Sequence, residues 1–161
     1  MVQLNNINLK LTTEHFTNDQ INAIKKLEEF YHSNELVFTL QGAAGTGKTY
    51  LLKYFLNNIV SKSVCVTAPT HKAVRVIEEI TGKKGRTLHS LHGFRLNINL
   101  ENFDINNTIF DPIADPSFNN YNLVICDECS QINQNLHSIN ITRAKQFNTK
   151  VIYVGEQHCP Q

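Results

Sequence analysis

Several features are missing from this chain of 161 residues, and each absence excludes a class of protein. No stretch approaches the ~18–20 continuous apolar residues of a membrane-spanning helix, so no membrane span is expected. The first residues, Met1–Asn6, lack the basic and then apolar build of a secretory leader. The four cysteines do not suggest a disulfide scaffold in a chain of this size. A cytoplasmic, reducing setting is therefore expected, which is the host-cell cytoplasm if the chain is viral.

Charge is scarce as well. Charged residues make up 18% of the chain, below the usual level of about 25%. The formal net charge is +1, which gives no strong electrostatic footprint for a nucleic acid, so such a partner has to be argued from local sites. The length fits one ordinary domain with a substantial core.

A glycine-rich segment is the most informative feature that is present. It satisfies the pattern G-x-x-x-x-G-K-[ST] of the loop that binds the phosphates of a nucleoside triphosphate, and consists of Gly42, Ala43, Ala44, Gly45, Thr46, Gly47, Lys48 and Thr49. Glycine lets backbone N–H groups turn toward an anion at the start of a helix. Lys48 would contact the β- and γ-phosphates, and the Thr49 hydroxyl would ligate Mg²⁺. A turn that only joins two elements does not require Gly-Lys-Thr at this point.

The remainder of the chain predicts an α/β fold. Short apolar runs predict strands at residues 35–41, 63–68, 122–126 and 150–155. Apolar residues at helical spacing predict helices over about 18–31, 48–60, 70–81 and 133–147, with a short helix or turn at 87–94. This alternation predicts a mostly parallel sheet with helices on both faces, and ligands at the carboxyl ends of the strands. Residues 1–15 are expected to form an N-terminal arm, and about 95–120 a small hairpin insertion.

An acidic pair, Asp127 and Glu128, directly follows the third predicted strand. Asp127 would hold Mg²⁺, and Glu128 would orient and deprotonate the attacking water. An acidic pair by itself is more often a solvated loop, but the phosphate-loop pattern upstream and the strand just before it favour the functional interpretation.

The cysteines leave a second interpretation of the same region open. Cys126, Cys129, His158 and Cys159 have the chemistry of zinc ligands. This alternative is disfavoured because Cys126 is expected to point into the core from its strand, and because only one C-x-x-C pair exists. Buried cysteine is also common as a small apolar residue.

Five blocks occur in an order that resembles the first motor domain of superfamily 1 DNA helicases of the RecD/Dda type. They are Phe16–Gln20, Gly42–Thr49, Thr67–Ala73, Thr87–Gly93 and Asp127–Ser130, and the resemblance covers about residues 13–156. It implies a RecA-like P-loop NTPase domain over residues 16–161 that belongs to an ATP-dependent DNA helicase, with ATP and Mg²⁺ as cofactors and single-stranded DNA as partner. It also suggests 5′–3′ polarity and a role in DNA replication or repair.

The resemblance implies roles for residues that the pattern alone leaves ambiguous. Gln20 would read the adenine base, although a glutamine at a helix start is ordinary by itself. Two blocks would contact single-stranded DNA: Pro69, Thr70, His71 and Lys72, then Thr87, His89 and Ser90. Without the resemblance, the first block is equally well a proline-started helix with a solvated lysine. The residues of the second block are then more often surface or capping residues. Lys83, Lys84 and Arg86 are expected in a solvated loop, and residues 95–120 fall where the family carries a strand-separating pin.

The chain departs from the family pattern near its end. Glu156 stands where the family has aspartate, and Cys159 where it has the glutamine that senses the γ-phosphate. A second RecA-like domain is absent from these residues. In the family it donates an arginine finger, which contributes about 10³–10⁵-fold in rate, and Arg143 on a helix of this domain is a poor substitute.

Three interpretations remain. The chain alone is expected to bind ATP weakly and hydrolyse it slowly, with unwinding dependent on a separate chain that carries the second motor domain. Alternatively it is a non-hydrolysing nucleotide- or DNA-binding remnant, or an accessory subunit. A P-loop ATPase outside the helicases is disfavoured by the two blocks of DNA-binding type.

Overall fold

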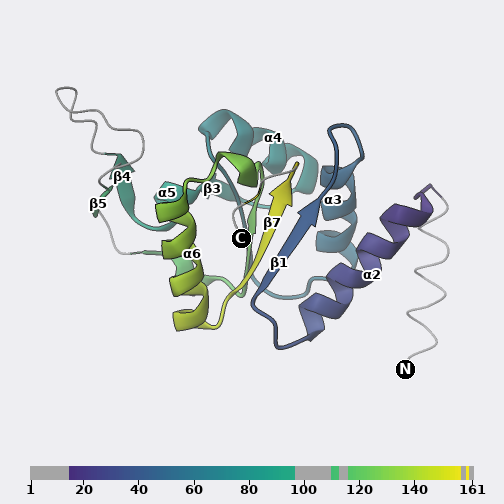
Figure 1. Cartoon of the computed structure of the whole chain (residues 1–161), viewed down its shortest axis with the longest axis horizontal. Coiled ribbons are helices and arrows are strands. Elements are labelled where there is room, and N and C mark those ends of the chain that lie inside the picture. The colour runs from purple at the N-terminus through teal and green to yellow at the C-terminus, as the bar shows by residue number, and fades with distance from the viewer. Residues whose placement is uncertain (1–14, 97–109, 113–115, 157–158, 160–161) are drawn as a thin grey trace.

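The computed structural model describes residues 15–96, 110–112, 116–156 and 159 (Figure 1). Its centre is a sheet of five strands in the order β1-β7-β6-β2-β3, and every neighbouring pair is parallel. The strands are β1 (Val37–Gln41), β2 (Val64–Ala68), β3 (Gly85–Thr87), β6 (Leu123–Cys126) and β7 (Lys150–Gly155). The parallel α/β fold predicted from the sequence is confirmed. Because the strands are parallel, all five carboxyl ends meet at one edge of the sheet.

Alternate residues of the inner strands pack into two separate cores, one on each face. On β6, Leu123 and Ile125 belong to one core, whereas Val124 and Cys126 belong to the other. This period of two follows from the geometry of a strand. Strands buried on both faces are continuously apolar, as the buried Leu-Val-Ile-Cys of β6 shows. The predicted covering of both faces by helices is therefore confirmed.

The first core contains residues of three helices, α2 (Asn18–His32), α3 (Lys48–Asn58) and α4 (His71–Thr81). The second contains residues of α5 (Leu88–Leu91), α6 (Gln134–Phe147) and the short 3₁₀ turns at 118–120 and 129–131. Figure 1 shows α2 and α3 on one side of β1 and β7, and α6 on the other. Among the described residues, no helix combines the length and apolarity required to cross a membrane.

Side chains at the helix starts explain where the helices begin. The Thr17 hydroxyl accepts from Gln20 N, and the Gln20 side chain accepts from Thr17 N, which completes a capping box for α2. Thr70 caps α4, and Asn133 caps α6 through Leu136 N. Gly82 ends α4 with a φ of 69°, a conformation that glycine adopts without strain. These boundaries agree with those predicted from the sequence.

One strand was not predicted. Residues 83–86 were expected in a solvated loop, but Gly85–Thr87 forms β3 beside β2. The expectation is wrong at Arg86, whose Nη1 donates to the Ser117 hydroxyl. A strand of three residues is too short to show a period of two. Its glycine is required by packing, since a Cβ at Gly85 would lie 2.9 Å from the carbonyl oxygen of Val66.

A small antiparallel ribbon leaves the domain after α5. It pairs β4 (Phe94–Leu96) with β5 (Phe110–Pro112), as the predicted hairpin insertion requires. Residues 97–109 between these strands lie outside the described residues, and so does nearly all of the predicted arm, 1–15.

Lys150 connects the start of β7 to the end of α2. Its ammonium donates to the carbonyls of Phe30 (3.0 Å), Ser33 (2.9 Å) and Glu35, and lies 4.5 Å from the centre of the Phe30 ring. We expect Lys150→Met to lower the free energy of unfolding by about 2 kcal/mol, because hydrogen bonds from a charged donor are lost at a helix end.

Urea unfolding measures this difference. The matched control is Lys145→Met, which removes an exposed lysine from α6. Equal stabilities of the two variants would contradict the role given to Lys150.

Candidate nucleotide site

Three predicted functional segments follow strands that lie side by side at the carboxyl edge of the sheet. The glycine loop follows β1, the acidic pair follows β6, and Gly155 and Glu156 end β7 between them. Gly42 N donates to Gly155 O at 3.2 Å, which joins the beginning of the loop to the end of β7. The sheet topology thus places near one another residues that are more than a hundred positions apart.

The loop has the conformation that its glycines permit. Gly45 and Gly47 have φ values of 75° and 80°, in the left-handed region. A Cβ at Gly47 would also lie 2.8 Å from the Gln20 side-chain nitrogen, and one at Gly42 would lie 2.9 Å from the Thr46 hydroxyl. Gly47 immediately precedes α3. The loop therefore leads into the positive end of a helix dipole, which favours an anion.

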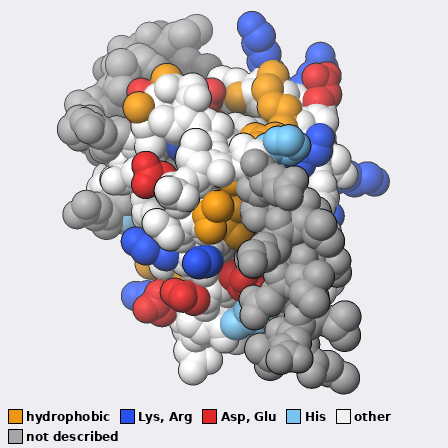
Figure 2. Space-filling model, turned by 90° about the vertical axis from the view of Figure 1, so that its right-hand side faces the viewer, with side chains coloured by type: hydrophobic (Ala, Val, Ile, Leu, Met, Phe, Trp, Pro, Cys, Tyr) orange, Lys and Arg blue, Asp and Glu red, His pale blue; other side chains and the backbone are white. Residues whose placement is uncertain are grey.

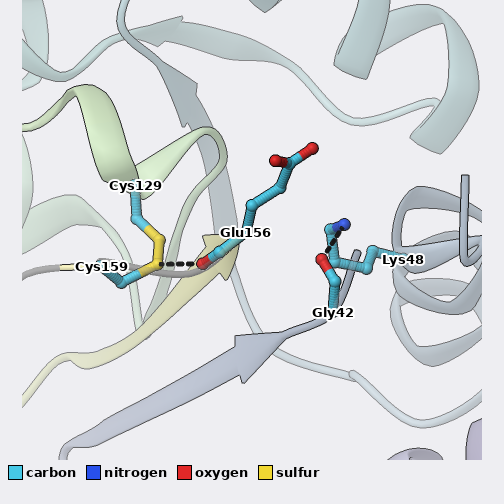
Figure 3. The surroundings of a disulfide bond; sticks show 5 residues. All are labelled: Gly42, Lys48, Cys129, Glu156 and Cys159. Carbon is cyan, nitrogen blue, oxygen red and sulfur yellow. Dashed lines mark hydrogen bonds between the residues drawn. A yellow bond between two sulfur atoms is a disulfide. The ribbon is translucent and has the colours of Figure 1, made fainter. Parts of the chain in front are cut away.

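The ammonium of Lys48 is held at the loop. Its Nζ donates to Gly42 O (2.6 Å) and Ala43 O (2.8 Å), and Figure 3 shows the first of these bonds. Ala43 O also accepts from the Thr46 hydroxyl at 2.8 Å. A cation is therefore fixed beside the loop, where its charge complements a phosphate.

Gln20 lies against the same loop and beside a cavity. Its Nε2 donates to Thr46 O at 2.9 Å, while its Oε1 accepts from Thr17 N at 3.0 Å. The adjoining cavity of about 490 Å³ lies within the range typical of small-ligand pockets. Its lining is formed by Thr17, Asp19, Gln20, Ala23, Leu40, Gln41, Gly42, Gly45, Thr46, Lys48 and Leu51.

The sequence indicated only part of this lining. Thr17, Asp19, Ala23, Leu40, Gln41 and Leu51 were not predicted as site residues, although the capping box that places Gln20 is visible as Thr-x-x-Gln.

Asp127 is positioned by the sheet and lies within electrostatic reach of Lys48. Its backbone N donates to Thr67 O at 2.9 Å, which continues the pairing of β6 with β2. The pKa of the Asp127 carboxyl is raised, mainly by burial, while a backbone hydrogen bond from Glu128 and, least of all, the charge of Lys48 lower it. Because the loop after β1 and the segment after β6 leave the same edge of the sheet, Lys48 and Asp127 lie on the same side of the molecule. The Asp127 carboxylate and the half-buried Thr49 hydroxyl are oxygen donors of the kind that Mg²⁺ prefers.

Glu128 has an unusual backbone conformation. Its φ of 53° and ψ of 43° lie in the left-handed region, which costs a residue other than glycine about 1–2 kcal/mol. The exposed side chain is oriented by Gln131, whose Nε2 donates to Glu128 Oε2 at 2.9 Å. Strained backbone is concentrated at functional sites. Of the described residues other than glycine, only Asn148 shares a positive φ.

The cysteines do not form the zinc site that the sequence left open. Cys129 and Cys159 are joined as a disulfide, whereas Cys65 and Cys126 are free and buried. His158 lies outside the described residues. No cluster of potential metal ligands of the His, Cys, Asp and Glu types occurs in the described part of the chain.

The disulfide adjoins the nucleotide site. Cys129 follows Glu128 directly, and Cys159 Sγ contacts Glu156 O at 3.7 Å. Figure 3 shows Glu156 between the disulfide and Lys48. Gly155 has no room for a side chain, since its Cβ would lie 2.7 Å from Cys129 Sγ. Cys159, which the resemblance places where the family has its γ-phosphate-sensing glutamine, is thus paired with Cys129.

The two predicted DNA-contacting blocks follow β2 and β3, the next strands along the same edge. Thr70 and Thr87 are N-caps whose hydroxyls accept from Ala73 N and Ser90 N, both at 3.2 Å. Thr70, His71, Lys72 and Ser90 are exposed, Pro69 and His89 are half-buried, and Thr87 is buried. Burial lowers the pKa of His89. Contact of these residues with DNA stays a prediction.

Comparison with known proteins decides the family. A family model described as AAA domain matches residues 15–160. The chain belongs to the AAA domain family. The ATP-dependent DNA helicase dda of Enterobacteria phage T4 is 28% identical over 149 residues, which are 91% of this chain and 33% of the helicase. The predicted resemblance of this AAA domain to superfamily 1 helicases of the RecD/Dda type is confirmed.

Two further similarities were found, one to a viral protein and one to a solved structure. Uncharacterized protein R530 of Acanthamoeba polyphaga mimivirus is 31% identical in an alignment of 160 residues that covers 87% of this chain and 32% of that protein. The crystal structure of Bacteroides sp Pif1 in complex with ADP-AlF4 has a TM-score of 0.58 at 24% identity, over 83% of this chain and 31% of Pif1, and shows the same fold. The AAA domain described here spans about a third of the length of its curated relatives.

The disulfide leads to a prediction of the number of free thiols in each chain. Under denaturing conditions without reductant, titration with a thiol reagent is expected to find two thiols per chain, those of Cys65 and Cys126, and all four after reduction. Cys159→Ser is expected to raise the first count to three, because Cys129 is then left free. Four thiols in the unreduced wild-type chain would contradict the pairing.

Proposed function

We propose that this AAA domain binds MgATP and single-stranded DNA as the N-terminal motor domain of an ATP-dependent DNA helicase. The observation that carries the proposal is the meeting of Lys48 and the Asp127–Glu128 pair at one edge of a parallel sheet. The helicase of phage T4, which matches over 91% of the chain, supports the same activity.

Each proposed nucleotide contact follows from the charge and position of a side chain. Lys48 turns from its loop carbonyls to the β- and γ-phosphates, and the loop N–H groups bind phosphate oxygens. Thr49 and Asp127 hold Mg²⁺, which supplies charge neutralisation on the phosphates when bound. Gln20 borders the cavity where the base would lie, and its amide would read the adenine edge.

Glu128 is proposed as the residue that activates water. The water oxygen forms a bond to the γ-phosphorus while the bond to the β,γ-bridging oxygen breaks, and Glu128 accepts the proton that the water loses. ADP and phosphate are the products. The side chain is suited to this because it is exposed at the edge of the site and its direction is fixed by Gln131.

Single-stranded DNA is proposed to lie across the ends of β2 and β3. Pro69, Thr70, His71 and Lys72 form one contact block, and Thr87, His89 and Ser90 form the other. Lysine, hydroxyl and backbone N–H groups are suitable partners for DNA phosphates. Figure 2 shows acidic and basic side chains interspersed over the side that carries α2, so attraction on that side depends on local donors. The expected polarity is 5′–3′.

Full motor activity is proposed to require a second RecA-like domain, on this polypeptide or on a separate chain. Such a domain would close over the nucleotide and supply an arginine finger. Arg143 does not take this part, because its guanidinium contacts His92 and lies 5.1 Å from the centre of the Phe94 ring.

A second candidate function is a domain that binds nucleotide or DNA but no longer hydrolyses ATP. The observation that favours it is the replacement of the γ-phosphate-sensing glutamine by Cys159, which is occupied in a disulfide. Nucleotide binding and hydrolysis therefore have to be measured separately.

The first measurement is the affinity for MgATP. Lys48→Ala is expected to raise the Kd about 10–100-fold, because a charge-assisted hydrogen bond of roughly 1.5–3 kcal/mol is lost. Calorimetric titration gives the constant. The control is Lys53→Ala, an exposed lysine of the same helix, which should leave the Kd unchanged. Equal affinities in all three proteins would overturn the nucleotide site.

The second measurement is the rate of ATP hydrolysis with and without oligo(dT). Glu128→Gln is expected to lower kcat at least about 100-fold, because a general base is removed, while the Kd for MgATP stays near the wild-type value. Ser130→Ala, an exposed neighbour, serves as control. Stimulation of the wild type by DNA supports the motor. Binding without turnover in either condition supports the second candidate.

A further inference from the structure

A buried chain of polar side chains lies on the α6 face of the sheet, away from the nucleotide cavity. Asn140 is the central member, with no exposed surface, and its Nδ2 donates to the Tyr153 hydroxyl at 2.7 Å. Its Oδ1 lies 3.2 Å from His92 Nε2. Arg143 Nη1 lies 2.8 Å from His92 Nδ1 and 2.9 Å from His92 O. The Arg143–His92–Asn140–Tyr153 set is called the α6 network below.

The direction of each hydrogen bond follows from the chemistry of the groups. Arginine can only donate, so His92 Nδ1 accepts and its proton is on Nε2, which donates to Asn140 Oδ1. The imidazole is neutral, because burial and the neighbouring Arg143 lower the pKa of His92 to about 3. Each hydrogen bond of the α6 network therefore has a fixed donor and a fixed acceptor. A rearrangement of His92 or Asn140 would leave a buried polar group unsatisfied.

Ring contacts fix the position of His92 further. Its imidazole stacks on Phe118 at 5.4 Å and 13°, and on Phe94 at 5.8 Å and 28°. The guanidinium group of Arg143 lies over the ring of Phe94, 5.1 Å from its centre. The plane of the imidazole is therefore set on two sides by aromatic rings.

The two ends of the network belong to different functional segments. His92 follows the Thr87–Ser90 block and directly precedes the turn into β4, the ribbon strand. Tyr153 lies on β7, two residues before Gly155, and pairs in register with Cys126, which directly precedes Asp127. Asn140 Nδ2 also contacts Cys126 Sγ at 3.6 Å. The network thus connects a proposed DNA-contacting segment to the two strands that end in acidic residues of the nucleotide site.

We infer that Asn140 and His92 are positioning residues that couple the binding of single-stranded DNA to the binding of nucleotide. The inference rests on the proposed function. A buried polar chain gives little net stability compared with an apolar core. It does join the α5–β4 segment to β6 and β7 through specific hydrogen bonds, and energetic coupling between sites is carried by contiguous networks of this kind.

The test measures the ratio of two dissociation constants for MgADP, without and with saturating oligo(dT). Coupling between sites typically amounts to about 5–150-fold, and the wild type is expected to show a ratio of at least about fivefold. His92→Phe keeps the stacked ring but removes both nitrogens, and is expected to bring the ratio close to one. His92→Gln retains a donor toward Asn140 and is expected to restore part of the wild-type ratio.

Asn140→Leu is the second variant, since it removes all three hydrogen bonds of the central side chain at similar volume. Its matched control is Asn135→Leu, an exposed asparagine of the same helix, which should keep the wild-type ratio. Thermal unfolding monitors folding, and a purely structural role would lower the Tm without changing the ratio. A wild-type ratio in the folded His92→Phe and Asn140→Leu proteins overturns the inference. Failure of the wild type to bind oligo(dT) at all overturns the proposed function as well and is seen directly in the same titrations.

Discussion

The parallel pairing of β1 with β7 and of β7 with β6 is the constraint on which the site depends. It brings three strand ends to one edge, and the Gly42 N to Gly155 O bond continues the pairing into the glycine loop. Without that convergence, the loop after residue 41 and the carboxylates after residue 126 would be unrelated in space. The same pairing explains why β6 is apolar throughout, since both of its faces are covered.

The backbone conformation after each strand differs with the role proposed for the residues there. Glycines at positive φ form the loop before α3, while Glu128 adopts a similar conformation at a cost, held by Gln131. Asp127 is partly buried, and burial raises the pKa of its carboxyl, with only a small opposing effect of Lys48. On the opposite face, the α6 network holds a neutral histidine among aromatic rings. Both faces of one sheet therefore contribute, one to the proposed nucleotide site and the other to the placement of the strands.

Local signals in the sequence were enough to predict the parts that depend on neighbours along the chain. The glycine loop, the end of the helix before Gly82 and the inner strands each depend on a few consecutive residues. The missed features depend on distant partners or on very short segments. His92 and Arg143 are 51 positions apart, the Cys129–Cys159 pair is separated by 30, and β3 has three residues. Pairings of this kind are set by the tertiary fold, and no single segment displays them.

The most direct test of the central claim is a crystal structure of the chain with MgADP and a metal fluoride that mimics the γ-phosphate. The account predicts that Lys48 Nζ leaves Gly42 O and Ala43 O for the phosphate oxygens, and that the metal lies between the Thr49 hydroxyl and the Asp127 carboxylate. A nucleotide bound elsewhere, or a metal on the far side of the sheet from Asp127, would contradict it.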